Sequence, residues 1–202
     1  MLDLQSPRIR SAHRPSRPYR YVLSLLATLA VLVVPTVASA ATGFKEEVAS
    51  ARWLISFQCP DGTTAADGRL IVETDNFIED GTTRDPNPPL RVGFVGQCPD
   101  GTFSWGFVQP APTQFDPDLK NVSVSGTFAN VRDNRGGVHT VSVDARWTAQ
   151  GPIMTTVNGP GSKSKERSAT ATATIVFDGT TLVDGAANFP FPAPFIRVDI
   201  EK

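Results

Sequence analysis

The sequence predicts an all-β protein, an antiparallel β-sandwich of about eight strands, with a closed β-barrel enclosing a ligand cavity as the alternative. Apolar and polar residues alternate along most of the chain after Ala51, which is the pattern of strands that bury one face. The dipeptide Asp-Gly recurs six times and favours tight hairpin turns between such segments. No segment after Ala51 shows a convincing helical period, so strands and turns define the fold class.

The strands in the first half of the chain are organised around a repeated hexapeptide. Gln-Cys-Pro-Asp-Gly-Thr occurs at 58–63 and again at 97–102, each time directly after an alternating segment. In the second copy Pro99 and Gly101 suit the corners of a tight turn, so the flanking strands should form a hairpin. The predicted strands of this half cover residues 51–59, 69–75, 90–98 and 102–108. A short helix is expected only at 44–51.

The second half is predicted to begin with a hairpin whose turn is Asn130–Gly137. Its strand from 138 to 147 shows the cleanest alternation in the chain. Weaker strands follow at 168–177 and 195–200, and loops are expected at 81–89, 109–118 and 150–166. The tryptophans follow the apolar phase of their strands, which predicts that they lie in the core: Trp53, Trp105 and Trp147.

Residues 1–40 are predicted to be a cleaved signal peptide. Five arginines precede an apolar run that ends at Val34, and Ala38-Ser39-Ala40 is the small-residue pattern that signal peptidase reads. The apolar run is short for a membrane span, which disfavours a retained anchor. Residues 41–202 are therefore expected to form one β-domain in a secreted or periplasmic location.

The charge of this predicted mature chain argues against nucleic acid as a partner. The leader contains five of the 19 basic residues and one of the 20 acidic residues, so the rest of the chain has a net charge of about −5. A mildly acidic domain without a basic stripe is a poor match for a phosphate backbone. No membrane contact is expected once the leader is removed. No cofactor is expected either, because a chain that folds after export is not loaded in the cytosol.

The chain has two cysteines, Cys59 and Cys98, and export predicts a disulfide between them. Each ends a strand on its apolar face. In a flat meander the two strands would lie about 9.6 Å apart, whereas a disulfide needs Cα atoms within roughly 7 Å. The strands are therefore expected either to be direct neighbours or, as we favour, to face each other across the sandwich.

The sequence does not identify a catalytic residue. His139 is the one histidine left after removal of the leader, and its place at the start of a strand favours a structural role over that of a base in a Ser-His-Asp triad. A pair of acids facing one cleft would be enough for a carboxylate-dependent glycan hydrolase. The acids considered for it are Glu73, Asp75, Glu79, Asp80, Asp85, Asp116, Asp118 and Asp144.

No metal site is predicted, and one stretch is only a weak calcium candidate. It contains four acids, Asp75, Glu79, Asp80 and Asp85, and carboxylates are ligands that Ca²⁺ prefers. Their spacing matches no known calcium loop, so solvated turn residues are the preferred interpretation.

Two segments are candidate binding sites. The first is a patch for an anionic ligand in a Gly/Ser-rich loop, formed by Lys163, Lys165 and Arg167, whose alternative role is to keep the loop soluble. The second is a Phe/Pro segment that presents Phe189, Phe191 and Phe195 to a partner or folds down to cap the core.

These observations predict an exported, non-catalytic β-domain that binds a partner or ligand, an unknown protein or a glycan, through its loops. Two alternatives remain: the glycan hydrolase, and a structural surface protein that self-associates through an exposed edge strand or the Phe/Pro segment.

Overall fold

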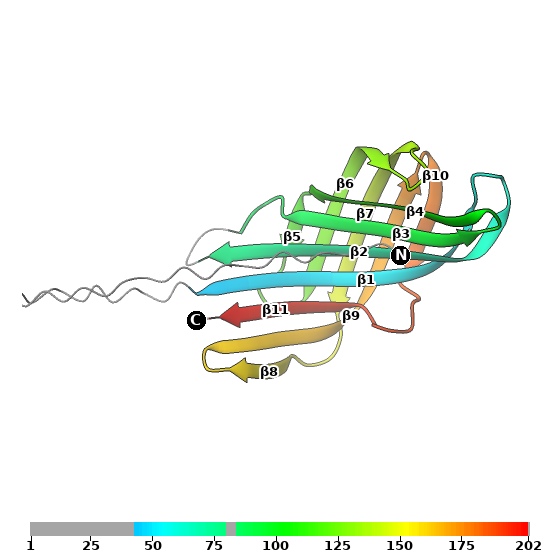
Figure 1. Cartoon of the computed structure of the whole chain (residues 1–202). Helices are drawn as coiled ribbons and strands as arrows, with labels where there is room; N and C mark the ends of the chain where they lie inside the picture. Colours follow the sequence, from blue (N-terminus) through cyan, green and yellow to red (C-terminus); the bar gives the residue numbers. More distant parts are fainter. Residues whose placement is uncertain (1–42, 80–83, 202) are drawn as a thin grey trace, which may run out of the picture. The chain divides into compact units, whose positions relative to one another are not determined.

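The computed structural model describes residues 43–79 and 84–201, which form eleven β-strands (Figure 1). The predicted signal peptide lies outside these residues. In chain order the strands are β1 Phe44–Gln58, β2 Thr64–Glu79, β3 Pro89–Cys98, β4 Gly101–Pro110, β5 Thr113–Phe115, β6 Asn121–Arg132, β7 Val138–Ala149, β8 Met154–Gly159, β9 Ser162–Phe177, β10 Thr180–Ala186 and β11 Phe195–Glu201.

The strands form two layers that share β9. The first half of β9, up to Ser168, pairs with β11, and the second half, from Ala169, pairs with β7. The first sheet therefore has the order β4-β3-β2-β1-β11-β9-β8, and the second has the order β5-β6-β7-β9-β10. Every ladder is antiparallel, and the strands of the second sheet cross those of the first (Figure 1).

The predicted all-β, sandwich-like fold is confirmed, and the closed-barrel alternative is wrong. A closed barrel needs a continuous ladder between its first and last strands. Here β4 meets the segment after β6 through one isolated bridge, between Trp105 and Asp133, and through hydrogen bonds of Asn134 to Thr102 and Ser104, which do not form a continuous ladder. The sheet consequently stays open along the rest of this edge.

The core lies between the two layers and contains the three tryptophans, as predicted. Trp53, Trp105 and Trp147 are at most 5% exposed. Aromatic rings from different strands pack here: Phe107 lies 4.6 Å from Phe128 of the other layer, and Trp105 lies 5.1 Å from Phe177 between ring centroids. The inward-facing residues of the alternating segments thus pack against each other between the two layers.

Three local expectations are wrong. The segment 44–51 is the first half of β1 rather than a helix, because Ala49 and Ala51 continue inward in the phase of Trp53 and residues 44–50 pair with both β2 and β11. The expected loops at 109–118 and 150–166 contain β5 and β8, which are short edge strands with little alternation. With β10, these additions raise the number of strands above the expected eight.

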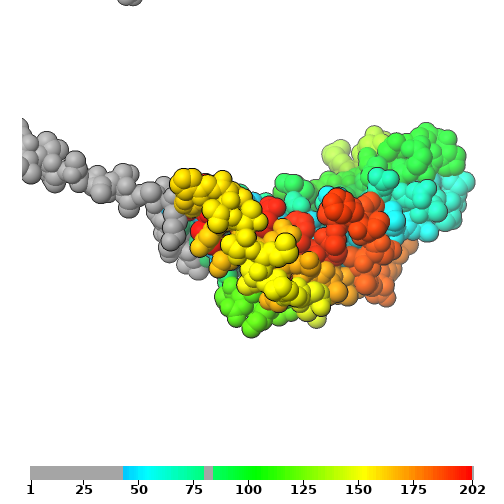
Figure 2. All heavy atoms as spheres, turned by 90° about the horizontal axis from the view of Figure 1, so that it is seen from below, coloured from blue at the N-terminus to red at the C-terminus, as the bar shows by residue number. Residues whose placement is uncertain are grey.

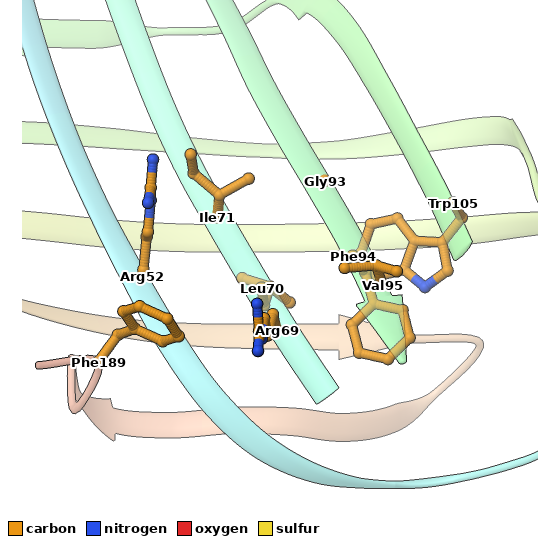
Figure 3. A pocket seen from close by; sticks show the side chains of 9 residues that line it. All are labelled: Arg52, Arg69, Leu70, Ile71, Gly93, Phe94, Val95, Trp105 and Phe189. Carbon is orange, nitrogen blue, oxygen red and sulfur yellow. The ribbon is translucent and has the colours of Figure 1, made fainter. Parts of the chain in front are cut away.

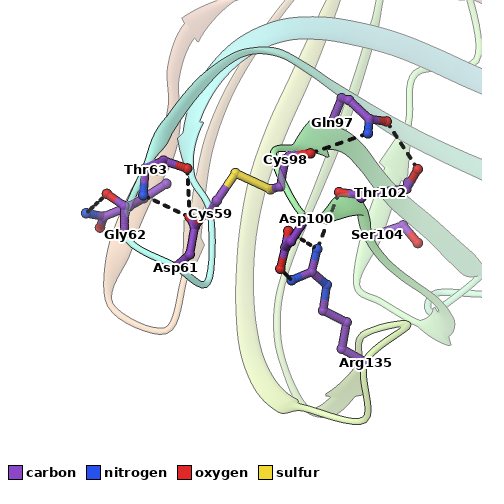
Figure 4. Close-up of a disulfide and its surroundings, with 12 residues drawn as sticks. Cys59, Asp61, Gly62, Thr63, Gln97, Cys98, Asp100, Thr102, Ser104 and Arg135 are labelled. Carbon is purple, nitrogen blue, oxygen red and sulfur yellow. Dashed lines mark hydrogen bonds and ion pairs between the residues drawn. A yellow bond between two sulfur atoms is a disulfide. The ribbon is translucent and has the colours of Figure 1, made fainter.

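The disulfide between Cys59 and Cys98 is present, with 5.9 Å between the Cα atoms, but the expected arrangement of its strands is wrong (Figure 4). β1 and β3 lie in the same sheet with β2 between them. The ladder from β2 to β3 stops at Arg69 and Val95, so β2 does not separate the last residues of β3 from β1. At Gly96 a Cβ would lie 2.2 Å from the Phe57 ring, which shows that the end of β1 folds closely over β3.

A search of the described residues for a helix of sufficient length and hydropathy to cross a membrane finds none.

Candidate functional site

Three neighbouring strands of the first sheet place cations beside apolar residues. Lys163, Lys165 and Arg167 alternate along β9 and pair with Ile200, Val198 and Ile196 of β11. On the next strand, β1, Lys45 is opposite Ile200 and Glu47 is opposite Val198. Because side chains alternate across a strand, all of these residues share the inner face of the sheet.

This inner face forms a hollow of about 390 Å³ near the ends of β1 and β11. Val198 and Ile200 form its floor. The cations of β1 and β9 form one wall, and the turn before β6 together with Ile153 forms the other wall. In that turn Leu119 is 4% exposed, and the backbone N–H of Leu119 donates to the Asp116 carbonyl at 3.0 Å. We call this site the lysine groove and define it by Lys45, Lys120, Lys165 and Arg167, with Lys163 adjoining on β9.

The cations of the lysine groove are unequally paired. Lys45 lies 2.6 Å from Glu47, and Lys120 lies 3.2 Å from Asp118. Arg167 donates to the Gly151 carbonyl at 2.7 Å, while its Nε is buried without a hydrogen-bond partner. Lys163 and Lys165 form no ion pair with any described residue.

The buried acid beside Lys45 is already fully engaged. Glu47 is 0% exposed, and Arg84 binds both of its oxygens at 2.6 and 2.7 Å in addition to Lys45. Arg84 also donates to the Phe115 carbonyl at 3.1 Å, so this buried carboxylate anchors the segment before β3 to β5. The charge of Glu47 is thus neutralised, and the positive charge of Lys163, Lys165 and Arg167 remains.

Across the described residues, six basic side chains have no carboxylate partner: Arg52, Arg69, Arg132, Lys163, Lys165 and Arg167. Three of them belong to the lysine groove or adjoin it. In a predicted mature chain with more acids than bases, such a cluster is better evidence for an anion-binding site than a single unpaired surface lysine.

The structure separates the two predicted binding segments. The cations of the first segment line the inner face of the first sheet, whereas Phe189 and Phe195 lie on its outer face. Phe191 is 82% exposed, and the Arg197 guanidinium lies 5.7 Å from the Phe195 ring. Phe189 and Phe195 therefore do not cap the core, and the six predicted residues do not form one site.

His139 is the centre of a polar cluster that joins the turn after β6 to the turn after β9. Its Nε2 lies 2.9 Å from Asp133 Oδ2, and its Nδ1 lies 2.7 Å from Asp178 Oδ2. A Cβ at Gly137 would lie 2.5 Å from Asp133 and 2.8 Å from the imidazole, so this cluster requires a glycine there. Because both ring nitrogens face carboxylates, the imidazole is held as a charged donor and does not have the free nitrogen that a general base needs.

The pKa values of this cluster shift as its geometry requires. Burial alone would lower the pKa of His139, but hydrogen bonds to Asp133 and Asp178 outweigh it and raise this pKa. Burial would raise the pKa of Asp133, but the imidazole and the backbone N–H groups of Arg135 and Gly137 lower it. The pKa of Asp178 is lowered against burial by the Thr140 N–H and by His139.

Asp144 shares a hollow of about 320 Å³ with Asp184, on either side of Thr174 on the outer face of the second sheet. The Asp144 side chain is 55% exposed and lies 3.5 Å from Arg146, and Thr174 donates to Asp184 at 3.3 Å. An open face of this kind does not supply the desolvated carboxyl that a general acid requires.

The weak calcium candidate gains no support from the residues that the structure describes. Asp80 lies outside them, and Asp85 accepts a hydrogen bond from the Asn87 backbone at 2.8 Å, as turn residues do. Within 43–79 and 84–201, no group of three or more acidic, histidine or cysteine side chains is arranged so that it could hold a metal ion.

Sequence reasoning missed Lys45, Lys120 and Glu47. Lys45 and Glu47 fell in the segment expected to be helical, although they share the strand phase of Ala49, Ala51 and Trp53. No sequence pattern marks Lys120. This residue reaches the lysine groove because the turn before β6 places it near Lys165 and Arg167 of β9.

Comparison with protein-family models, curated proteins and solved structures finds no match to this chain.

Proposed function

We propose that the protein is an exported, non-catalytic domain that binds an anionic amphiphile in the lysine groove. The observation that carries this proposal is the gathering of Lys163, Lys165 and Arg167, which have no carboxylate partner in the described part of the chain, around an apolar floor. The leader pattern and the disulfide between Cys59 and Cys98 support export.

The groove suits a charged head joined to an apolar body. Ile200 and Ile153 offer apolar surface above the buried Val198, and the ammonium groups of Lys45 and Lys165 lie at its margin. A volume of about 390 Å³ is within the range of small-ligand sites. Lysines bind an anion as flexible point charges, so the site fits a carboxylate or phosphate head group without demanding one orientation.

Isothermal titration calorimetry with decanoate tests this function on protein expressed from the full sequence and purified after export. Decyl maltoside, with the same chain and a neutral head, is the matched ligand, and both are used at concentrations too low for micelles to form. We expect saturable decanoate binding that weakens as salt rises, because exposed charges are screened. Equal binding of the two ligands would contradict the proposal.

A triple variant, Lys163→Gln, Lys165→Gln and Arg167→Gln, locates the binding. Each charge-assisted contact contributes about 1.5–3 kcal/mol, so we expect at least a tenfold loss of affinity. Arg132→Gln is the control, because Arg132 also lacks a carboxylate partner but lies at the end of β6 outside the groove. Loss of binding in the control alone would contradict the assignment.

One observation favours a second candidate, a structural protein that self-associates through β8. Met154 and Val157 are 67% and 74% exposed on this edge strand, whose ladder is with β9. Exposed apolar edges are templates for strand addition. Sedimentation at increasing concentration tests this candidate: it predicts a rising mass that Val157→Lys abolishes, and a constant monomer mass would contradict it.

A further inference from the structure

A second groove lies on the opposite, outer face of the first sheet. It has a volume of about 400 Å³, and its accessible walls are Arg52, Arg69, Ile71, Gly93, Val95 and Phe189 (Figure 3). We call it the arginine groove. It shares no lining residue with the lysine groove, so binding in one groove does not require binding in the other.

The register of four strands shapes the floor of the arginine groove. Arg52 of β1 is opposite Ile71 of β2, Ile71 is opposite Gly93 of β3, and Gly93 is opposite Gly106 of β4. The two adjacent glycines leave a strip without side chains. A Cβ at Gly93 would lie 3.3 Å from Ile71, so a larger residue would crowd this strip.

Phe189 is held in place as a wall. β1 pairs with β11 only up to Ser50, so the next residues of β1 have a free edge on that side. Asn188 occupies this edge: its side chain accepts from the Leu54 N–H at 2.7 Å and donates to the Leu54 carbonyl at 3.0 Å. The Phe189 N–H donates to the Arg52 carbonyl at 3.4 Å. The aromatic wall is therefore fixed before any ligand arrives.

The charges of this groove are uncompensated. Neither Arg52 nor Arg69 has a carboxylate partner among the described residues, and Arg52 Nε is buried without a hydrogen-bond partner. The Arg69 guanidinium lies 5.9 Å from the centre of the Phe189 ring. Glu73, two residues from Ile71 on the same face, is already paired with Arg91 at 3.2 Å. Two guanidinium groups thus face an apolar surface without a counter-charge.

We propose that the arginine groove is a binding site for a compact carboxylate with an aromatic body. Guanidinium groups match a carboxylate with paired N–H donors and also stack on aromatic rings. The carboxylate takes the position between Arg52 and Arg69. The aromatic body lies on Ile71, between Phe189 on the β1 side and the strip at Gly93 on the β3 side.

The test is an amide NMR titration of the exported protein with phenylacetate, paired with phenylacetamide, which has the same shape without the charge. We expect phenylacetate to shift the amide signals of Ile71 and Gly93 saturably, and phenylacetamide to bind at least tenfold more weakly. No saturable shift with phenylacetate, equal affinities, or shifts confined to other strands would each overturn the proposal.

Matched variants sharpen the test. Arg52→Gln and Arg69→Gln should each weaken phenylacetate binding about tenfold, whereas Arg132→Gln should not change it. Phe189→Ala should weaken binding, whereas Phe191→Ala, at the 82% exposed position in the same segment, should not. Unchanged binding in Arg52→Gln or Arg69→Gln would overturn the proposal. The comparison of the two ligands on the unaltered protein holds even if a variant fails to fold.

Discussion

The two ends of the sandwich differ in how their charged and polar side chains are paired. At the disulfide end, polar side chains are paired. Arg135 binds Asp100 of the other layer at 2.8 Å (Figure 4), and Asn134 bonds the β4 backbone. Within the second sheet, His139 is held between two carboxylates. At the other end, Lys165 lines the lysine groove and Lys163 adjoins it, and neither has an acidic partner among the described residues, although Lys45 of the same groove is paired with the buried Glu47.

The space-filling view from below shows part of the second end, where β8 and the first half of β9 are exposed at the surface (Figure 2). Paired charges stabilise an arrangement, and unpaired charges beside apolar surface are available to a ligand. The comparison therefore assigns stability to the disulfide, the His139 cluster and the buried Glu47 pairs, and binding to the unpaired cations of the lysine groove. Variants of both ends, taken in order of decreasing expected effect on stability, test that division.

The disulfide should have the largest effect. Replacing both Cys59 and Cys98 by alanine releases a closed loop with a sequence separation of 39. In the chain-entropy model this lowers the free energy of unfolding by about 4 kcal/mol. Urea denaturation of the two proteins measures the difference, and a loss below about 1 kcal/mol would show that the disulfide does not hold this end together.

Glu47→Gln should follow, with a loss of about 3 kcal/mol. It removes one partner of a buried ion pair and leaves Arg84 and Lys45 without a counter-charge. Glu73→Gln, which disrupts a more exposed pair with Arg91, is the matched control and should cost about 1 kcal/mol or less. Equal losses in the two variants would contradict the anchoring role of Glu47.

His139→Gln should cost about 1–2 kcal/mol, with a distinct pH dependence. The pKa of His139 is raised, so the stability it contributes is complete below about pH 6.5 and is lost as pH rises through its folded-state pKa. The pKa values of Asp133 and Asp178 are lowered, so their contribution is present above about pH 4 and is lost in more acidic solution. The difference from the parent protein should peak between these limits, and a pH-independent difference would contradict the charged cluster.

The smallest effect on stability is expected in the lysine groove. Lys163→Gln with Lys165→Gln should change the free energy of unfolding by no more than about 0.5 kcal/mol, because neither lysine forms an ion pair with a described residue. The same variant should lose decanoate affinity. A destabilisation above about 1.5 kcal/mol would show that these lysines serve the fold instead.

Much of the fold was predictable because alternation is a local signal. The segments around Trp53, Phe94 and Val143 carry it clearly, and the hairpins at Pro99–Gly101 and Asn130–Gly137 follow from turn chemistry. β5 and β8 were missed because an edge strand needs no clear alternation, and the first half of β1 was missed because residues 47–51 are buried on both faces. The place of the disulfide within one sheet depends on curvature at Gly96 and Phe57, which periodicity does not encode.

The lysine groove was predictable in part. The alternation of Lys163, Lys165 and Arg167 marked a cationic face. Its partners Lys45 and Lys120 come from distant segments that only strand order and a turn bring together. The arginine groove could not be foreseen, because Arg52, Arg69 and Phe189 meet through register and through the docking of Asn188 on β1.

Binding in the lysine groove is tested most directly by an amide NMR map of the exported protein with decanoate at concentrations too low for micelles to form. We expect saturable shifts centred on Val198, Ile200 and Lys165, which weaken as salt rises. Shifts centred on the His139 cluster or the outer face of the second sheet, or no saturable shifts, would contradict the assignment of binding to the lysine groove.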